Sequence, residues 1–296
     1  MSVTMLAGRR ERSRDRALVK RRGWYGVGVS GVVCAAVIAL AALVAVIGSW
    51  ISPYDVDVSD LSQSWVGPGQ VSGHALGFDA QGRDLLSRLL GGARSAVLGP
   101  LGVVVISIVL GGALAVFAAW RGGKVDAFIG ACLDVLFAFP GILLAILAAA
   151  VFGAGLTSAV IALAIAYTPF VARILRSAAL KVRSQPYIAA LEVQGQSGFA
   201  ICARHILTNM ASLVVAQSTI LFGYAMVDLA AISFLGLGVR APKPDWGLMV
   251  AENQSGILQG YPLPTLLAGL SIVVVVVAFN VLGERLYQRA VGGGVQ

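Results

Sequence analysis

The sequence predicts an all-α membrane protein with six transmembrane helices. Of its 296 residues, 58% are apolar and only 12% are charged, which is about half the charged share of an ordinary globular chain. The apolar residues come in long blocks instead of the narrow stripe of an amphipathic surface helix. Three cysteines without framework spacing exclude a secreted disulfide scaffold.

Six apolar blocks reach or approach the roughly 20 residues that a helix needs to cross a bilayer core. The first block follows basic residues, as a signal peptide would, but its apolar stretch is too long, so we expect an uncleaved anchor. Pro140 is expected to kink the third span, and Pro169 leaves the inner end of the fourth open. The blocks are 27–51, 96–119, 128–151, 156–172, 213–237 and 263–282.

The distribution of Lys and Arg predicts that both termini are cytoplasmic. With the N-terminus inside, 17 of the 22 basic residues fall on the inner side of the membrane, in agreement with the positive-inside rule. The basic run near the N-terminus is then a topology anchor at an anionic leaflet. No aromatic residues are interleaved with it, so we expect no nucleic-acid partner.

The spans divide the chain into five parts. We expect a second external loop over 239–262, where prolines mark turns, and an unusually long cytoplasmic loop over 173–211. The parts are a basic cytoplasmic segment 1–26, an anchor helix 27–51, an extracytoplasmic loop 52–95, a core of five transmembrane helices 96–285 and a cytoplasmic tail 286–296.

The extracytoplasmic loop is expected to end in an amphipathic helix over 83–94. Four leucines fall on one face of this segment. Asp84 and Arg88 are four residues apart on the other face, so we expect a modest surface ion pair between them.

The long cytoplasmic loop is predicted to hold a short helix over 187–194. Pro186 suits the first helical turn, because its missing N–H would be unpaired there in any case. Gly195 ends this helix, and a second helix over 199–211 leads into the fifth span. Composition alone is equally consistent with a solvated connector.

Two carboxylates, Asp134 and Asp228, lie within the predicted spans. A charge near the middle of a bilayer costs about 2.5–3.5 kcal/mol on insertion scales, so such a residue usually faces a cavity or a partner. Asp134 lies near the cytoplasmic third and is equally consistent with an interfacial anchor. Asp228 lies deeper and is the better candidate for a pathway or for an interface between permeases.

Searches for other chemistry find no site. No GxxxxGK[ST] phosphate loop is present, so we expect no ATP site on this chain. His74 and His205 fall on opposite sides of the membrane, and His74 with Asp79 would make only a weak two-ligand metal site. No catalytic Ser/His/Asp set is apparent. We therefore expect no catalytic, cofactor-binding or metal-binding residues.

Several motifs resemble the C-type inner-membrane permease subunit of the dipeptide, oligopeptide and nickel ABC importers. The similarity covers about residues 74–285, and it includes Asp134 followed by Phe139 and Pro140, the run 233–247 and the run 278–283. The external signature of the family falls on His74, Gly77, Asp79, Gly82, Arg83, Asp84, Arg88 and Arg94.

The resemblance extends to the cytoplasmic motif through which the family couples to ATPases. The usual Glu of this motif is Ala189 here and the usual Pro is Thr208, whereas Gly195 and Asn209 are kept. The resemblance implies an ATPase-coupling interface made of Tyr187, Ile188, Ala189, Ala190, Leu191, Gly195 and His205.

The resemblance also implies the architecture and the partners. It implies a type I ABC importer permease fold in a bacterial inner membrane, a second homologous permease, two cytoplasmic ATPase subunits or domains that hold ATP and Mg, surrounding lipid and an extracytoplasmic substrate-binding protein. The implied cargo is dipeptides or short oligopeptides, with nickel or metal chelates as the alternative. An ion-coupled secondary transporter is a distant alternative, because we find no clear repeat and only one deep carboxylate.

Overall fold

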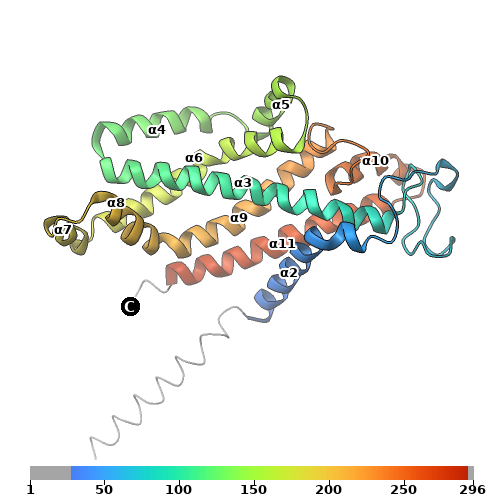
Figure 1. The fold of residues 1–296 in the computed structure, drawn as a ribbon, viewed down its shortest axis with the longest axis horizontal. Helices are drawn as coiled ribbons and strands as arrows, with labels where there is room; N and C mark the ends of the chain where they lie inside the picture. The colour runs from blue at the N-terminus through green and yellow to red at the C-terminus, as the bar shows by residue number, and fades with distance from the viewer. Residues whose placement is uncertain (1–27, 293–296) are drawn as a thin grey trace, which may run out of the picture.

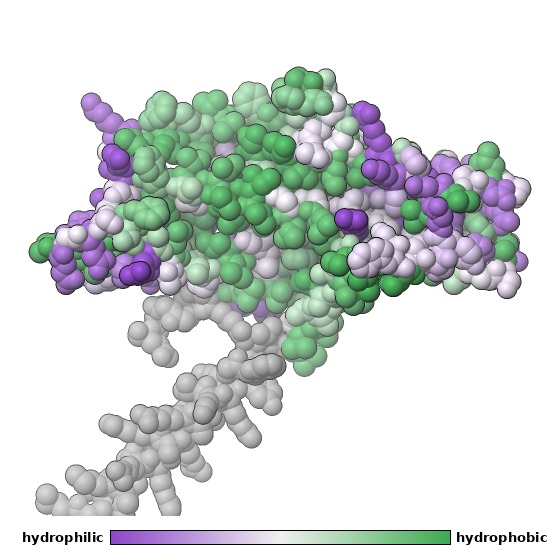
Figure 2. Space-filling model, viewed as in Figure 1, coloured by the Kyte–Doolittle hydropathy of each residue, from purple (hydrophilic) through white to green (hydrophobic). Residues whose placement is uncertain are grey.

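The computed structural model describes residues 28–292, and within that range the chain is helical apart from its connections. Five helices are long and apolar enough to cross a membrane, and one bent helix pair can supply a sixth span. Figure 1 shows these helices side by side in an elongated bundle. Figure 2 shows an apolar band around the middle of the bundle and hydrophilic residues at its two ends. The predicted all-α membrane fold is therefore confirmed.

Five of the six predicted spans correspond in order to long helices, and the bent helix pair stands in the place of the third. The basic segment 1–26 lies outside the described residues. Helix α3 contacts α2, α6 and α9, so it lies at the centre of the bundle. The long helices are α2 (Gly28–Ile51), α3 (Leu85–Arg121), α6 (Leu156–Arg183), α9 (Leu207–Phe234) and α11 (Leu263–Gly292).

Helix α3 joins two elements that the sequence predicts as separate. The expected amphipathic helix over 83–94 and the second span form one helix of 37 residues. At 1.5 Å per residue it is about 55 Å long, well beyond the roughly 30 Å of a hydrocarbon core. Its first turns, capped by Asp84, therefore belong to a polar end of the bundle.

The third span is broken, whereas the sequence predicted a kinked helix. Helices α4 (Gly123–Phe137) and α5 (Gly141–Phe152) meet at an angle of 79°. Pro140 lies at the start of α5. It has no N–H for a continuing helix, and it disfavours the helical conformation for Phe139 before it.

Pro169 does not end its helix. Helix α6 continues through Pro169 to Arg183, beyond the apolar block that ends at 172, which settles the inner end that the sequence left open. Proline is tolerated within membrane helices. Just before Pro169, the Thr168 hydroxyl donates a hydrogen bond to the Ala164 carbonyl at 2.7 Å.

The predicted cytoplasmic loop is shorter than expected, because helices enter it from both sides. Helix α7 (Pro186–Val193) agrees with the predicted short helix. After Gly195, α8 (Gly198–Ile201) and a π-helical turn (Cys202–Ile206) lead directly into α9. The extended part is thus confined to two short connections on either side of α7.

The second external loop holds a helix that the sequence did not reveal. Helix α10 (Trp246–Leu258) begins at Asp245, whose side chain accepts hydrogen bonds from the N–H groups of Gly247 and Leu248. Trp246 and Met249 are buried. Helix α10 lies at the same end of the bundle as the loop 52–84 (Figure 1).

The orientation of the bundle stays a prediction, and it can be tested by labelling. In a chain whose native cysteines are replaced by serine, we expect Gln70→Cys and Gln254→Cys to react with an impermeant thiol reagent in intact cells. Ser184→Cys should react only after the cells are opened. All three positions are exposed. Labelling of Ser184→Cys in intact cells would mean that the predicted orientation of the helices is wrong.

Candidate functional site

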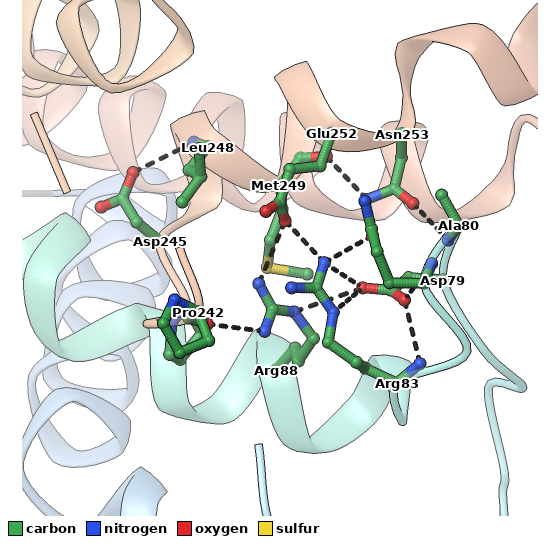
Figure 3. Close-up of polar contacts among 12 residues, drawn as sticks. Asp79, Ala80, Arg83, Arg88, Pro242, Asp245, Leu248, Met249, Glu252 and Asn253 are labelled. Atoms are coloured by element: carbon green, nitrogen blue, oxygen red, sulfur yellow. Dashed lines mark hydrogen bonds and ion pairs between the residues drawn. The ribbon is translucent and has the colours of Figure 1, made fainter. Parts of the chain in front are cut away.

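Three external signature residues, Asp79, Arg83 and Arg88, meet the partly buried Glu252 in a cluster of four charges, shown in Figure 3. The Asp79 carboxylate contacts Arg83 at 2.7 Å and Arg88 at 3.3 Å. The Glu252 carboxylate contacts the same two guanidinium groups, at 2.6 Å and 3.2 Å. Arg88 and Asp79 are fully buried, and Arg83 is nearly so. The cluster, called here the external charge cluster, joins the loop 52–84 and α3 to α10.

Arg88 also holds two backbone segments in place. One of its nitrogens donates to the carbonyls of Val56 and Pro242, each at 3.0 Å. Beside it, the Asn253 side chain accepts from the N–H of Ala80 at 2.9 Å. The cluster is therefore a junction of three chain segments that are far apart in the sequence.

The predicted surface pair of Asp84 and Arg88 is wrong. Asp84 is the N-cap of α3 and accepts from the Ser87 N–H at 2.8 Å, because a capping side chain turns toward the free N–H groups of the first helical turn. Its other oxygen contacts His74 at 2.8 Å. Both Asp84 and Arg88 are buried.

His74 lies in an aromatic setting that does not suit a metal site with Asp79. Its ring stacks on Tyr54 at a centroid distance of 4.0 Å and lies 4.4 Å from the Phe78 ring. The carboxylate that contacts His74 is that of Asp84, whereas the Asp79 carboxylate forms ion pairs with Arg83 and Arg88. Within residues 28–292, no three His, Cys, Asp or Glu side chains gather at a possible metal site.

Two signature glycines are required by the backbone of this loop. Gly77 and Gly82 have φ angles of +74° and +68°, which side-chain-bearing residues rarely adopt. A Cβ atom at Gly82 would lie 1.8 Å from the Asp60 carbonyl oxygen, and one at Gly77 would lie 2.3 Å from that of Val66. By contrast, Arg94 is exposed on α3.

Burial and hydrogen bonding shift the pKa values of Arg83 and Asp245, at this end of the bundle, in opposite directions. Burial lowers the pKa of Arg83, but its hydrogen bonds and its attraction to Asp79 and Glu252 outweigh this and hold the pKa above its usual value. Burial raises the pKa of Asp245, although hydrogen bonds from Ser95 and from backbone N–H groups oppose the rise. The arginine is thus held charged by its partners.

The predicted coupling residues gather around α7 at the other end of the bundle. Gly195 follows the helix with a φ of +77°. Tyr187 is half-exposed and its hydroxyl accepts from the Asn209 side chain at 3.1 Å. The ring of His205 lies 6.3 Å from that of Tyr187. Ala189 and Ala190 are exposed, and Leu191 is partly buried.

Ile188 is not on the exposed face of α7. Its side chain is 1% exposed and packs within the chain, so it anchors α7 and is unavailable to a partner in this structure. The large apolar side chains that do face outward are Val193, 90% exposed, and Phe199, 85% exposed. Neither was among the predicted coupling residues: Val193 lies near the end of the predicted helix 187–194, and Phe199 begins the next one.

The two carboxylates of the spans have different surroundings. Asp134 is exposed on α4 and contacts Arg173 of α6 at 2.8 Å. Asp228 is partly buried on α9 and accepts a hydrogen bond from the Tyr167 hydroxyl at 2.7 Å. Asp134 therefore helps to hold α4 against α6, whereas Asp228 faces a pocket between helices.

Comparison with known proteins identifies the class. Residues 107–292 match the family described as the binding-protein-dependent transport system inner membrane component. The chain belongs to this family of multi-pass proteins of the bacterial inner membrane, and it is a transport subunit. The resemblance to peptide ABC importer permeases is confirmed by named relatives.

Three of these relatives cover most of the chain. The dipeptide transport permease DppC of Alkalihalophilus pseudofirmus is 36% identical, over 74% of this chain and 71% of its own. The glutathione transport permease GsiD of Pectobacterium atrosepticum is 35% identical, over 80% and 78%. The di/tripeptide transport permease DppC of Pseudomonas aeruginosa is 35% identical, over 82% and 81%.

A solved structure supports the fold. The inward-facing MetNI methionine ABC transporter contains a chain that superposes with a TM-score of 0.57 at 18% identity, over 69% of this chain and 96% of that one. The type I ABC importer permease fold that the resemblance implied is therefore confirmed.

The external charge cluster is expected to stabilise the folded chain only as a complete set. Arg88→Met leaves Asp79 and Glu252 with one arginine between them, and breaking a buried ion pair costs about 3–5 kcal/mol. We expect the apparent melting temperature of the purified protein in detergent to fall by several degrees.

The matched control is Arg173→Met, which removes an ion pair whose side chains are 58% and 69% exposed. Such a pair contributes about 0–1 kcal/mol, so the melting temperature should hardly change. Equal effects of the two substitutions would contradict the stabilising role of the cluster.

Proposed function

We propose that this chain is one permease subunit of an ABC importer that takes up dipeptides or short oligopeptides. The observation that carries the proposal is the set of relatives named as dipeptide, di/tripeptide and glutathione permeases, which are 35–36% identical over most of the chain. In this proposal the chain pairs with a second, homologous permease, and the peptide crosses between them. An extracytoplasmic binding protein delivers the peptide.

In the same proposal, ATP and Mg are held by two ATPase subunits or domains that dock on the coupling end. The geometry of that end supports this assignment. Helix α7 carries the half-exposed Tyr187, while Val193 and Phe199 present nearly complete apolar side chains to the surroundings at a polar end of the bundle. Exposed aromatic and aliphatic side chains of this kind are typical anchors for a partner's groove.

Docking through these side chains can be tested by making them polar. Val193→Ser with Phe199→Ser should leave the abundance of the protein in the membrane unchanged, because both side chains already face outward. Peptide uptake should fall by roughly tenfold or more, since anchor residues contribute more than about 1–2 kcal/mol each. Peptide should also cease to stimulate ATP hydrolysis.

The control substitution is Leu258→Ser at the end of α10, where the side chain is 93% exposed at the opposite end of the bundle. It makes the same polarity change away from the proposed docking site, so coupling should be normal. Full uptake and stimulation in the double variant at normal abundance would mean that this end is only a connector.

The cargo is tested by uptake of labelled di- and tripeptides in a strain that lacks this gene, with nickel uptake measured in parallel. We expect peptide uptake to be lost in the deletion strain and restored by the intact gene, with nickel uptake unchanged. Normal peptide uptake with lost nickel uptake would replace the peptide assignment with the metal alternative.

A further inference from the structure

The break in the third span borders an open pocket of about 420 Å³. In Figure 1, α5 turns away from the line of α4 above α6. The volume falls within the roughly 300–1,000 Å³ of pockets that hold small ligands. The side chains that give the pocket its character are Phe137 and Phe139 at the break, Tyr167 and Phe170 of α6, and Tyr224 and Asp228 of α9.

The lining combines aromatic rings with one carboxylate. Phe139 and Tyr224 are each about half-exposed, so their rings border the open space, whereas the Phe137 ring already has the Arg173 guanidinium 4.6 Å from its centre. The face of an aromatic ring attracts a cation that lies within about 6 Å of its centre. Asp228 adds a negative charge to the same lining, and this combination is suited to a positively charged group.

Asp228 differs from the other acids of the neighbouring helices in having no basic partner on the described chain. Asp126 and Asp134 of α4 pair with Arg176 and Arg173 of α6. Asp228 accepts from the neutral Tyr167 hydroxyl, and across residues 28–292 no Lys or Arg forms an ion pair with it. A carboxylate in a membrane span usually faces a partner or a ligand.

We infer that the pocket binds the protonated amino end of a peptide as it passes through the permease. The ammonium group donates to the Asp228 carboxylate, and the surrounding aromatic rings face its positive charge. Tyr167 holds the carboxylate in place from the other side. This inference rests on the proposed peptide function and deepens it: the pathway itself selects for a free α-amino group.

The test uses the whole complex of permeases and ATPases in lipid nanodiscs, without the binding protein. Equilibrium binding of labelled Ala-Ala is compared with that of N-acetyl-Ala-Ala, which lacks the positive charge. We expect the wild-type complex to prefer Ala-Ala by tenfold or more, since hydrogen bonds to charged groups are among the strong ones. Asp228→Asn should remove this preference, and Asp228→Glu should keep part of it.

Asp134→Asn is the matched control, because it neutralises the other carboxylate of the spans at an exposed site outside the pocket lining. It should keep the wild-type preference. The inference is overturned if Asp228→Asn keeps the preference, or if the wild-type complex binds neither peptide. It is also overturned if Asp228→Asn alone prevents the two permeases from copurifying, because the carboxylate then belongs to their interface.

Uptake by cells that contain the binding protein separates failure of the pocket from failure of the proposed function. If cells with Asp228→Asn take up peptide as well as wild-type cells, the inference about the pocket is wrong, but the proposed function as a peptide permease stands. If wild-type cells take up no peptide, the proposed peptide cargo is wrong.

Discussion

The close contact between α3 and α6 is the constraint on which the other helix positions depend. At Gly111 a Cβ atom would lie 2.8 Å from the Val171 side chain and 2.9 Å from the Thr168 carbonyl oxygen, so only glycine allows this approach. One turn away, Ser107 donates to the Ala164 carbonyl at 3.0 Å. Within lipid, apolar side chains gain little from leaving the solvent, so small residues and interhelical hydrogen bonds bring helices together. The opposite side of α6 is thereby directed toward α4 and the pocket.

The fold class and the order of the spans could be predicted from the sequence, because long apolar blocks and the uneven distribution of charge are direct consequences of crossing a bilayer. The breaks and ends of the long helices could not. Pro140 and Pro169 lie in equally apolar surroundings, yet the chain breaks at the first and continues as a helix through the second. The difference depends on contacts with neighbouring helices, and a local sequence pattern carries no information about those contacts.

The site shows the same division between local and distant information. Helix α7 and its end at Gly195 could be predicted, because proline and glycine act on the adjacent backbone. The signature residues of the external loop were found through the resemblance, but their pairing was not. Spacing alone favoured Asp84 as the partner of Arg88, whereas the fold brings Glu252, 164 residues away, to that guanidinium. Ile188 was assigned to the coupling interface although it is buried, because its burial depends on packing beyond α7.

Helix α3 runs from the external charge cluster to the end of the bundle that carries α7. Near its first turns, Arg88 is held in the external charge cluster. At its last turn, Trp120 packs against the backbone of Gly198, where a Cβ atom would lie 2.6 Å from the indole ring, and the Arg183 guanidinium lies 4.8 Å from the centre of that ring. A continuous hydrogen-bonded helix resists stretching and bending, so a displacement of the segment that follows α7 acts on the same element that carries the external junction. The 37-residue length of α3, which the sequence divided into a loop helix and a span, is what makes this connection possible.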